Sequence, residues 1–163
     1  MRIIKTVSIG MMCLLLLSGC TGRELEDREF VEAMELNMQE EELVGGFGGA
    51  LVSGSTVEEI RKSYQNHMDV YLDLGHIKAI VLGKELLKNK EKMRSVLLEL
   101  EQMPMISRNS LVFTHNYDSG ESYLVTLARQ GKIPGEYLCD TYHNNPYHTE
   151  DEVVSLGDLL STI

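Results

Sequence analysis

The sequence predicts an α+β domain of mixed α/β character, with a mixed sheet of about four strands, crossover helices and a helical C-terminal end. Two observations predict this class. Segments typical of strands and helices alternate between residues 30 and 114, and this order favours a sheet covered by its own connections. Beyond residue 120 the patterns are mainly helical.

Residues 1–19 have the pattern of a secretory signal peptide. Arg2 and Lys5 precede an almost uncharged apolar run over residues 6–17, which is the usual order of a signal peptide. A membrane-spanning helix needs roughly 20 apolar residues, so this run is too short to span comfortably. Residues 17–20, Leu-Ser-Gly-Cys, look like the lipobox of bacterial lipoproteins, in which the cysteine thiol receives a diacylglycerol.

We therefore predict a signal peptide at residues 1–19 and a single lipoprotein domain at residues 20–163, lipidated on Cys20. The alternative is an uncleaved short anchor with an incidental cysteine. Cys13 would leave with the signal peptide and Cys20 would carry the lipid, so Cys139 would be the one free thiol and no internal disulfide could form.

The mature chain is strongly acidic. Loss of Arg2 and Lys5 from the 15 basic residues leaves 13 against 25 acidic ones, a net charge of −12. This charge argues against nucleic acid as a partner and against a basic grip on anionic lipid heads. The lipid would have to supply the membrane affinity.

Three strands are expected from their apolar patterns, and the glycine-rich stretch described below is a further candidate as a bulged strand. Apolar and acidic residues roughly alternate over residues 30–36, residues 77–82 form an apolar run, and residues 110–114 follow as a third strand. Residues 39–42 predict a solvated bend. The glycine-rich residues 45–49 predict a bulged strand or hairpin turn, because no Lys-Ser/Thr pair follows to complete a phosphate-binding loop.

Helices are expected between and after these strands. Thr56 and Glu59 form a capping box that starts a helix ending at about residue 67. A long helix is predicted over residues 84–101, ended by Pro104. The C-terminal part predicts short helices over residues 121–128, 134–142 and 156–163.

A catalytic or metal site does not emerge from these residues. There is no G-x-S-x-G motif. His143 and His148 could in principle ligate a metal, but residues 144–146, Asn-Asn-Pro, separate them, so a polar surface loop is the favoured interpretation. Cys139 is expected to be a buried structural thiol. We therefore expect no enzymatic activity and no cofactor.

The order of motifs resembles the Ger(x)C family, the lipoprotein C subunits of spore germinant receptors, in its N-terminal domain. The resemblance rests on residues 23–27 (Arg-Glu-Leu-Glu-Asp), on the Gly-His-x-Lys-x-Ile-x-x-Gly pattern over residues 75–83, on Arg108-Asn109 and on residues 133–138. Within it, Gly75, His76 and Gly83 are family-motif positions with an expected structural role. Thr21-Gly22 departs from the Trp-Asp that commonly follows the family's cysteine.

The resemblance implies a non-enzymatic receptor subunit at the inner membrane of the spore. Such subunits assemble with multi-pass A and B subunits that respond to small nutrients. Family members continue through further domains, so a chain ending at Ile163 is expected to be a truncated member: a stand-alone paralogue, a frameshifted product or part of a split subunit. The alternative is an orphan exported lipoprotein that binds a small molecule or a metal.

Overall fold

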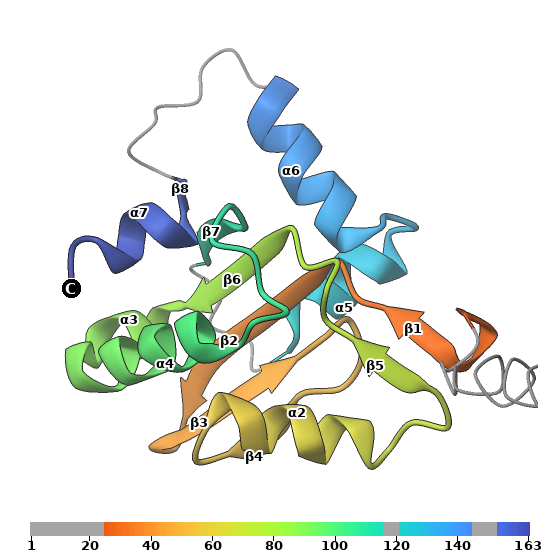
Figure 1. Ribbon diagram of the computed structural model, residues 1–163, viewed down its shortest axis with the longest axis horizontal. Coiled ribbons are helices and arrows are strands. Elements are labelled where there is room, and N and C mark those ends of the chain that lie inside the picture. The colour runs from red at the N-terminus through yellow and green to blue at the C-terminus, as the bar shows by residue number, and fades with distance from the viewer. Residues whose placement is uncertain (1–24, 116–120, 145–152) are drawn as a thin grey trace, which may run out of the picture.

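The computed structural model describes residues 25–115, 121–144 and 153–163 (Figure 1). The predicted fold class is confirmed, because helices cover a mixed sheet and the C-terminal end is largely helical. The main sheet is larger than expected, with six strands in the order β4-β3-β2-β6-β7-β8. Within the described ranges, no helix combines the length and the apolar character needed to cross a bilayer.

Three parallel strands form the centre of the main sheet. β2 (Ala33–Gln39) pairs with β6 (Ala79–Gly83), which pairs with β7 (Leu111–His115). Antiparallel strands extend both edges, namely β3 (Glu42–Gly46) and β4 (Val52–Gly54) beside β2, and β8 (Val154–Ser155) beside β7. A separate two-stranded sheet pairs β1 (Arg28–Phe30) with β5 (Tyr71–Asp73) in parallel. The 3-10 turn η1 (Leu25–Asp27) precedes β1.

Helices cover both faces of the main sheet. α2 (Val57–Gln65), α3 (Lys84–Lys88), α4 (Lys90–Gln102) and α7 (Leu156–Leu160) pack on the larger core, to which the sheet contributes side chains such as Met34, Ile80 and Val112. α5 (Tyr123–Arg129) and α6 (Pro134–Asn144) pack on the other face, against Ala33, Ala79 and Val81. In Figure 1, α4 lies in front of the sheet and α5 behind it.

The expected helix over residues 84–101 is in fact two helices. Asn89 has φ −96° and ψ 87°, which ends α3, and its side chain accepts a hydrogen bond from Lys92 N–H at 3.0 Å. Asparagine is a favoured N-cap, so Asn89 starts a new helix at a point where the hydrophobic stripe alone predicts one continuous helix.

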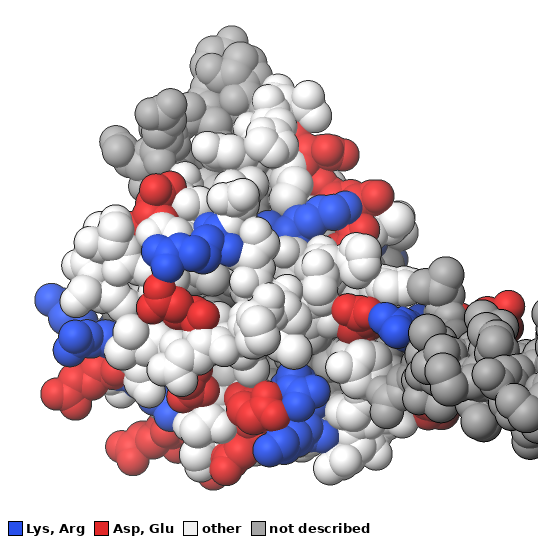
Figure 2. All heavy atoms as spheres, viewed as in Figure 1, with Lys and Arg blue, Asp and Glu red and all other residues white. Residues whose placement is uncertain are grey.

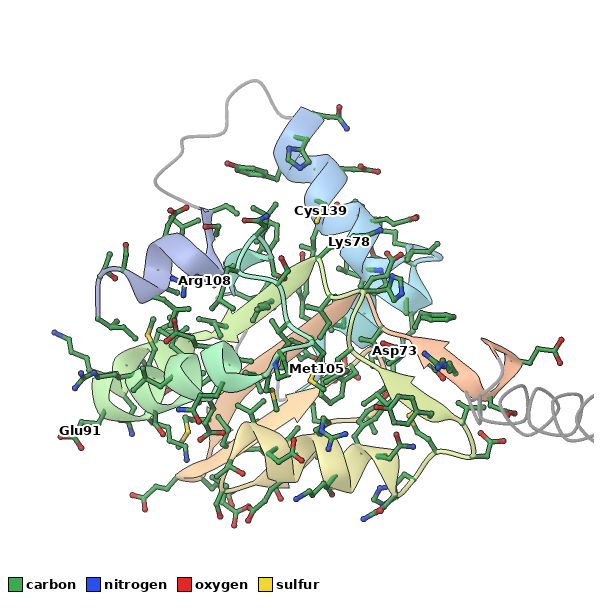
Figure 3. All side chains as sticks on the ribbon, viewed as in Figure 1. Asp73, Lys78, Glu91, Met105, Arg108 and Cys139 are labelled. Atoms are coloured by element: carbon green, nitrogen blue, oxygen red, sulfur yellow. The ribbon has the colours of Figure 1, made fainter. Side chains whose placement is uncertain are left out.

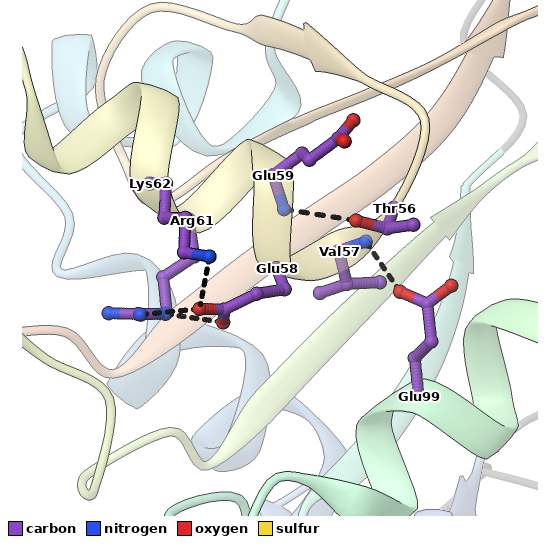
Figure 4. Close-up of polar contacts among 7 residues, drawn as sticks. All are labelled: Thr56, Val57, Glu58, Glu59, Arg61, Lys62 and Glu99. Carbon is purple, nitrogen blue, oxygen red and sulfur yellow. Dashed lines mark hydrogen bonds and ion pairs between the residues drawn. The ribbon is translucent and has the colours of Figure 1, made fainter.

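The start of α2 follows the predicted capping pattern with one difference (Figure 4). Thr56 Oγ1 accepts a hydrogen bond from Glu59 N–H at 3.1 Å, as expected. The Glu59 carboxylate accepts from Ser55 N–H, one residue before the cap. Val57 N–H donates to Glu99 of α4 at 2.7 Å, so a carboxylate from a second helix satisfies another free N–H group at this end.

Candidate functional site

Two of the predicted site positions lie outside the described residues. Cys20, the predicted lipidation site, belongs to residues 1–24, and His148, one member of the histidine pair, belongs to residues 145–152. His143 lies exposed on α6 with its ring 5.2 Å from that of Tyr142. The described residues contain no group of three or more His, Cys, Asp or Glu side chains arranged to hold a metal ion.

The family-motif segment begins in the turn between β5 and β6. Gly75 N–H donates to Asp73 Oδ1 at 3.0 Å, and Asp73 also pairs with Arg28 at 3.1 Å. These contacts hold the pKa of Asp73 below its ordinary value, the Gly75 hydrogen bond being the larger cause. His76 is exposed, and its ring makes a T-shaped contact with that of Phe30 at a centroid separation of 4.9 Å.

Lys78 fixes the start of β6 against the link between β1 and β2. The Lys78 and Ala79 N–H groups donate to the Glu32 carbonyl at 2.8 and 3.2 Å. Lys78 Nζ lies 3.1 Å from Glu32 Oε1, a contact that raises the pKa of the lysine. The other carboxylate oxygen, Glu32 Oε2, is buried and has no hydrogen-bond partner among the described residues.

Gly83 ends β6 where no side chain would fit. A Cβ atom there would fall on the side chain of Asn37 in the neighbouring strand β2. Asn37 Oδ1 accepts from Leu86 N–H at 3.2 Å, so the amide that lies against Gly83 also satisfies the first turn of α3. Gly75 therefore contributes a backbone hydrogen bond in a turn, whereas Gly83 allows a close approach to Asn37.

A cavity of about 350 Å³, here called the sheet-end cavity, lies at the carboxyl ends of the parallel strands. Its wall includes the second half of β2, Val81 and Gly83 of β6, and His115 at the end of β7. β2 turns away into its hairpin with β3, whereas β6 leads into α3. Ligands of open α/β sheets commonly bind outside the carboxyl ends of parallel strands.

Glu35 is a buried acid in the wall of this cavity. Its side chain is on the α5 face of β2, and the residue is 8% exposed. The carboxylate accepts hydrogen bonds from the Ser122 hydroxyl and, at 2.9 Å, from Tyr123 N–H at the start of α5. Burial raises the pKa of Glu35, and these hydrogen bonds only partly oppose the rise.

The alternation in residues 30–36 did not identify Glu35 as a site residue, because an acidic residue between Met34 and Leu36 resembles the solvent-facing half of a strand. Its hydrogen-bond partner Ser122 is 87 residues away in sequence. The sequence carries a weak signal for Ser122 itself, because serine is a favoured helix cap. Its hydroxyl caps α5 by accepting a hydrogen bond from Val125 N–H at 3.0 Å.

Two aromatic rings form another part of the cavity wall. His115 and Tyr123 stack at a centroid distance of 3.8 Å with 29° between their planes. Burial lowers the pKa of His115 and raises that of Tyr123. Both shifts favour uncharged rings near neutral pH.

A second hollow of about 280 Å³, the Phe30 groove, lies between β1, the glycines after β3 and the start of α6. Phe30 and Ile133 line it and are 43% and 57% exposed. Glu29 and Glu32 are the charged residues of its described wall, and one oxygen of Glu32 is the unpaired acceptor noted above. The groove thus combines exposed apolar side chains with acidic residues.

Cys139 lies half-buried on α6 near Lys78 (Figure 3). Burial raises the pKa of its thiol, which disfavours the nucleophilic thiolate.

These features define a small mixed α/β domain with two open hollows at its surface. The chain belongs to the family of the spore germination protein N-terminal domain, whose family model matches residues 21–163. The resemblance stated from the motifs is thereby confirmed, and the family gives the chain a role in spore germination. No curated protein and no solved structure matches the chain.

Proposed function

We propose that the chain is a non-enzymatic lipoprotein subunit of a nutrient germinant receptor. Lipid on Cys20 anchors it at the outer face of the spore inner membrane, and it assembles there with multi-pass A and B subunits. One observation carries the proposal: the family match begins at residue 21, directly after the Leu-Ser-Gly-Cys motif of residues 17–20. A lipid with two acyl chains supports lasting attachment, because one chain alone binds only marginally.

The surface of the domain supports attachment by lipid rather than by charge. On the face shown in Figure 2, acidic and basic side chains are interspersed around a mainly uncharged centre. Several basic side chains of the described residues are paired; Arg61, for example, lies 2.7 Å from Glu58, and Arg108 lies 2.6 Å from Glu101. Such pairs leave little attraction for anionic lipid heads.

The Phe30 groove is the face that we assign to a receptor partner. Phe30 ends β1, ten residues after the proposed lipid site, so the groove would lie near the membrane and the multi-pass subunits. The complementary segment would place an apolar side chain against Phe30 and Ile133.

The test is quantitative co-purification of the A and B subunits with the tagged full chain from spore membranes. Mass spectrometry of the N-terminal peptide reports the lipid on Cys20. Cys20→Ser should release the chain from the membrane, and Phe30→Ser with Ile133→Ser should reduce recovery of the subunits while membrane attachment persists. Leu98→Ser is the matched control, because Leu98 is 39% exposed on α4 and does not line the groove.

Unmodified Cys20 in membrane-bound chain would contradict the anchor. Recovery of the lipidated chain without A and B subunits would contradict the receptor assignment. Equal loss of the subunits with Leu98→Ser would remove the groove from the interface. Unchanged germination of a deletion strain across a nutrient panel would also count against the receptor role.

A further inference from the structure

The sheet-end cavity exists because α5 and α6 cover only part of one sheet face. These helices pack near the amino ends of β2 and β6, against Ala33 and Ala79. Asn37 and Gly83, at the carboxyl ends of the same strands, line the cavity instead. Its volume of about 350 Å³ falls within the range of small-molecule sites, about 300–1,000 Å³.

The cavity offers no basic partner to an anion, because its described wall contains neither lysine nor arginine. Two of its acidic side chains are compensated by basic residues outside the wall. Glu85 lies 2.6 Å from Lys88. Glu121 lies 3.0 Å from Arg129. These pairs remove much of the attraction that the two carboxylates would have for a cation.

The other two acidic side chains of the wall add little attraction for a cation. Glu35 accepts hydrogen bonds from the Ser122 hydroxyl and from Tyr123 N–H, and burial raises its pKa, which favours the uncharged acid. Glu40 is exposed in the turn between β2 and β3, where water and salt screen its charge. The wall therefore favours an uncharged ligand over an anion or a cation.

Neutral amide groups near the end of β2 remain available for hydrogen bonds in this wall. Asn37 Oδ1 accepts from Leu86 N–H at 3.2 Å, so the free end of this amide is its NH₂ group, which donates to no described residue. The Gln39 side chain is exposed and makes no hydrogen bond within the described ranges. Such amides can donate to hydroxyl groups of a ligand, and Gln39 can also accept from them.

An uncharged aromatic surface lines the same cavity. The His115 and Tyr123 rings stack with their centroids 3.8 Å apart. Burial lowers the pKa of His115, which favours its uncharged ring near neutral pH. The face of an aromatic ring is electron-rich and attracts the positive edge of C–H groups. Amides beside such a surface suit a molecule with hydroxyl groups on its rim and C–H groups on its face.

We propose that the sheet-end cavity binds a small uncharged sugar, of the size of one pyranose ring. Its hydroxyl groups form hydrogen bonds with the Asn37 and Gln39 amides. Its C–H face lies against the His115–Tyr123 stack. This site does not depend on the receptor role, since its ligand binds to the isolated chain.

The test compares sugars that share one ring and differ in charge. Methyl α-D-glucopyranoside is the uncharged probe, D-glucosamine the cation and D-glucuronate the anion; cyclohexanol controls for binding of an apolar ring alone. Each is titrated into the full chain, solubilised in a detergent without a sugar headgroup, and the His115 and Tyr123 ring signals are followed by NMR. We expect saturable shifts with the glucoside and a Kd on the order of 1 mM.

The charged probes and one variant test the chemistry of the wall. Glucuronate should bind at least about fivefold more weakly than the glucoside, and glucosamine no more tightly than the glucoside. Gln39→Ala removes one neutral hydrogen bond and should weaken glucoside binding about two- to tenfold. Gln102→Ala is the matched control, because Gln102 is exposed at the end of α4 and does not line the cavity; it should leave the affinity unchanged.

Tighter binding of glucosamine or glucuronate than of the glucoside would overturn the proposal. So would equal shifts with cyclohexanol, a linear response to the glucoside without saturation, or unchanged affinity in Gln39→Ala. Absence of sugar binding would not affect the receptor assignment, which the co-purification decides separately.

Discussion

Gly83→Ala should strongly destabilise the domain through one identified contact. Gly83 has φ −76° and ψ 155°, a conformation open to any residue, so backbone strain plays no part. The new Cβ would overlap the Asn37 side chain, which must then release Leu86 N–H. Overpacking costs about 1–3 kcal/mol and a lost hydrogen bond about 0.5–1.5 kcal/mol, so we expect a loss of about 2–4 kcal/mol.

Urea denaturation measures this loss, and two further variants isolate its cause. Gly75→Ala is the matched control from the same motif: its Cβ would lie 3.1 Å from Asp73 Oδ1 in an exposed turn, so it should cost less than about 1 kcal/mol. Asn37→Ala alone should lose the hydrogen bond, about 1 kcal/mol. Combined with Gly83→Ala, it should remove the overlap and leave the double variant more stable than Gly83→Ala alone. Additive losses would refute the steric explanation.

Three further predictions follow from other parts of the molecule. Glu41 has φ +72° in the two-residue turn between β2 and β3. Glu41→Gly should therefore stabilise the fold by about 0.5–1 kcal/mol in urea denaturation, because relief of about 1–2 kcal/mol of backbone strain exceeds glycine's entropic cost. A loss of stability would contradict this. The pKa of Glu35 is raised above its ordinary 4.5, so the folded state keeps a proton that the unfolded state has lost, and stability should fall as pH rises from about 4.5 through the raised pKa and then level off. Glu35→Gln should flatten that part of the stability curve, whereas parallel curves for the two proteins would argue against the shift. Burial of Cys139 should make its thiol react with a disulfide reagent at pH 7.5 more slowly than free glutathione, as followed by mass spectrometry of its peptide; equal rates would show an accessible thiolate.

The sequence pattern identified the elements whose signals are local. Thr56 with Glu59 placed the start of α2, and the apolar run before Gly83 placed β6. The short strands β1, β4, β5 and β8 were not resolved as strands of their own, because two or three residues carry no measurable periodicity and their pairing depends on distant partners. These strands account for most of the difference between the expected sheet and the observed one.

The candidate site was less accessible to sequence reasoning than the fold. The sheet-end cavity brings together β2, β6, β7 and the start of α5, which are far apart in the chain. No spacing rule links Glu35 to Ser122 or His115 to Tyr123 before the topology is known. The family-motif residues were recognised from sequence, and the structure now gives each a contact: Gly75 with Asp73, His76 with Phe30, and Gly83 with Asn37.

These contacts connect the motif to the cavity through the register of two strands. β2 and β6 pair with Ala33 opposite Ala79 and Leu36 opposite Leu82. The Glu32–Lys78 contact fixes this register at one end, and the fit of Asn37 against Gly83 fixes it at the other. A slip of one residue would turn every side chain of β2 to the opposite face. Glu35 would then leave the cavity wall and enter the apolar core. The motif therefore determines the chemistry of this cavity, although Val81 and Gly83 are the motif residues that line it.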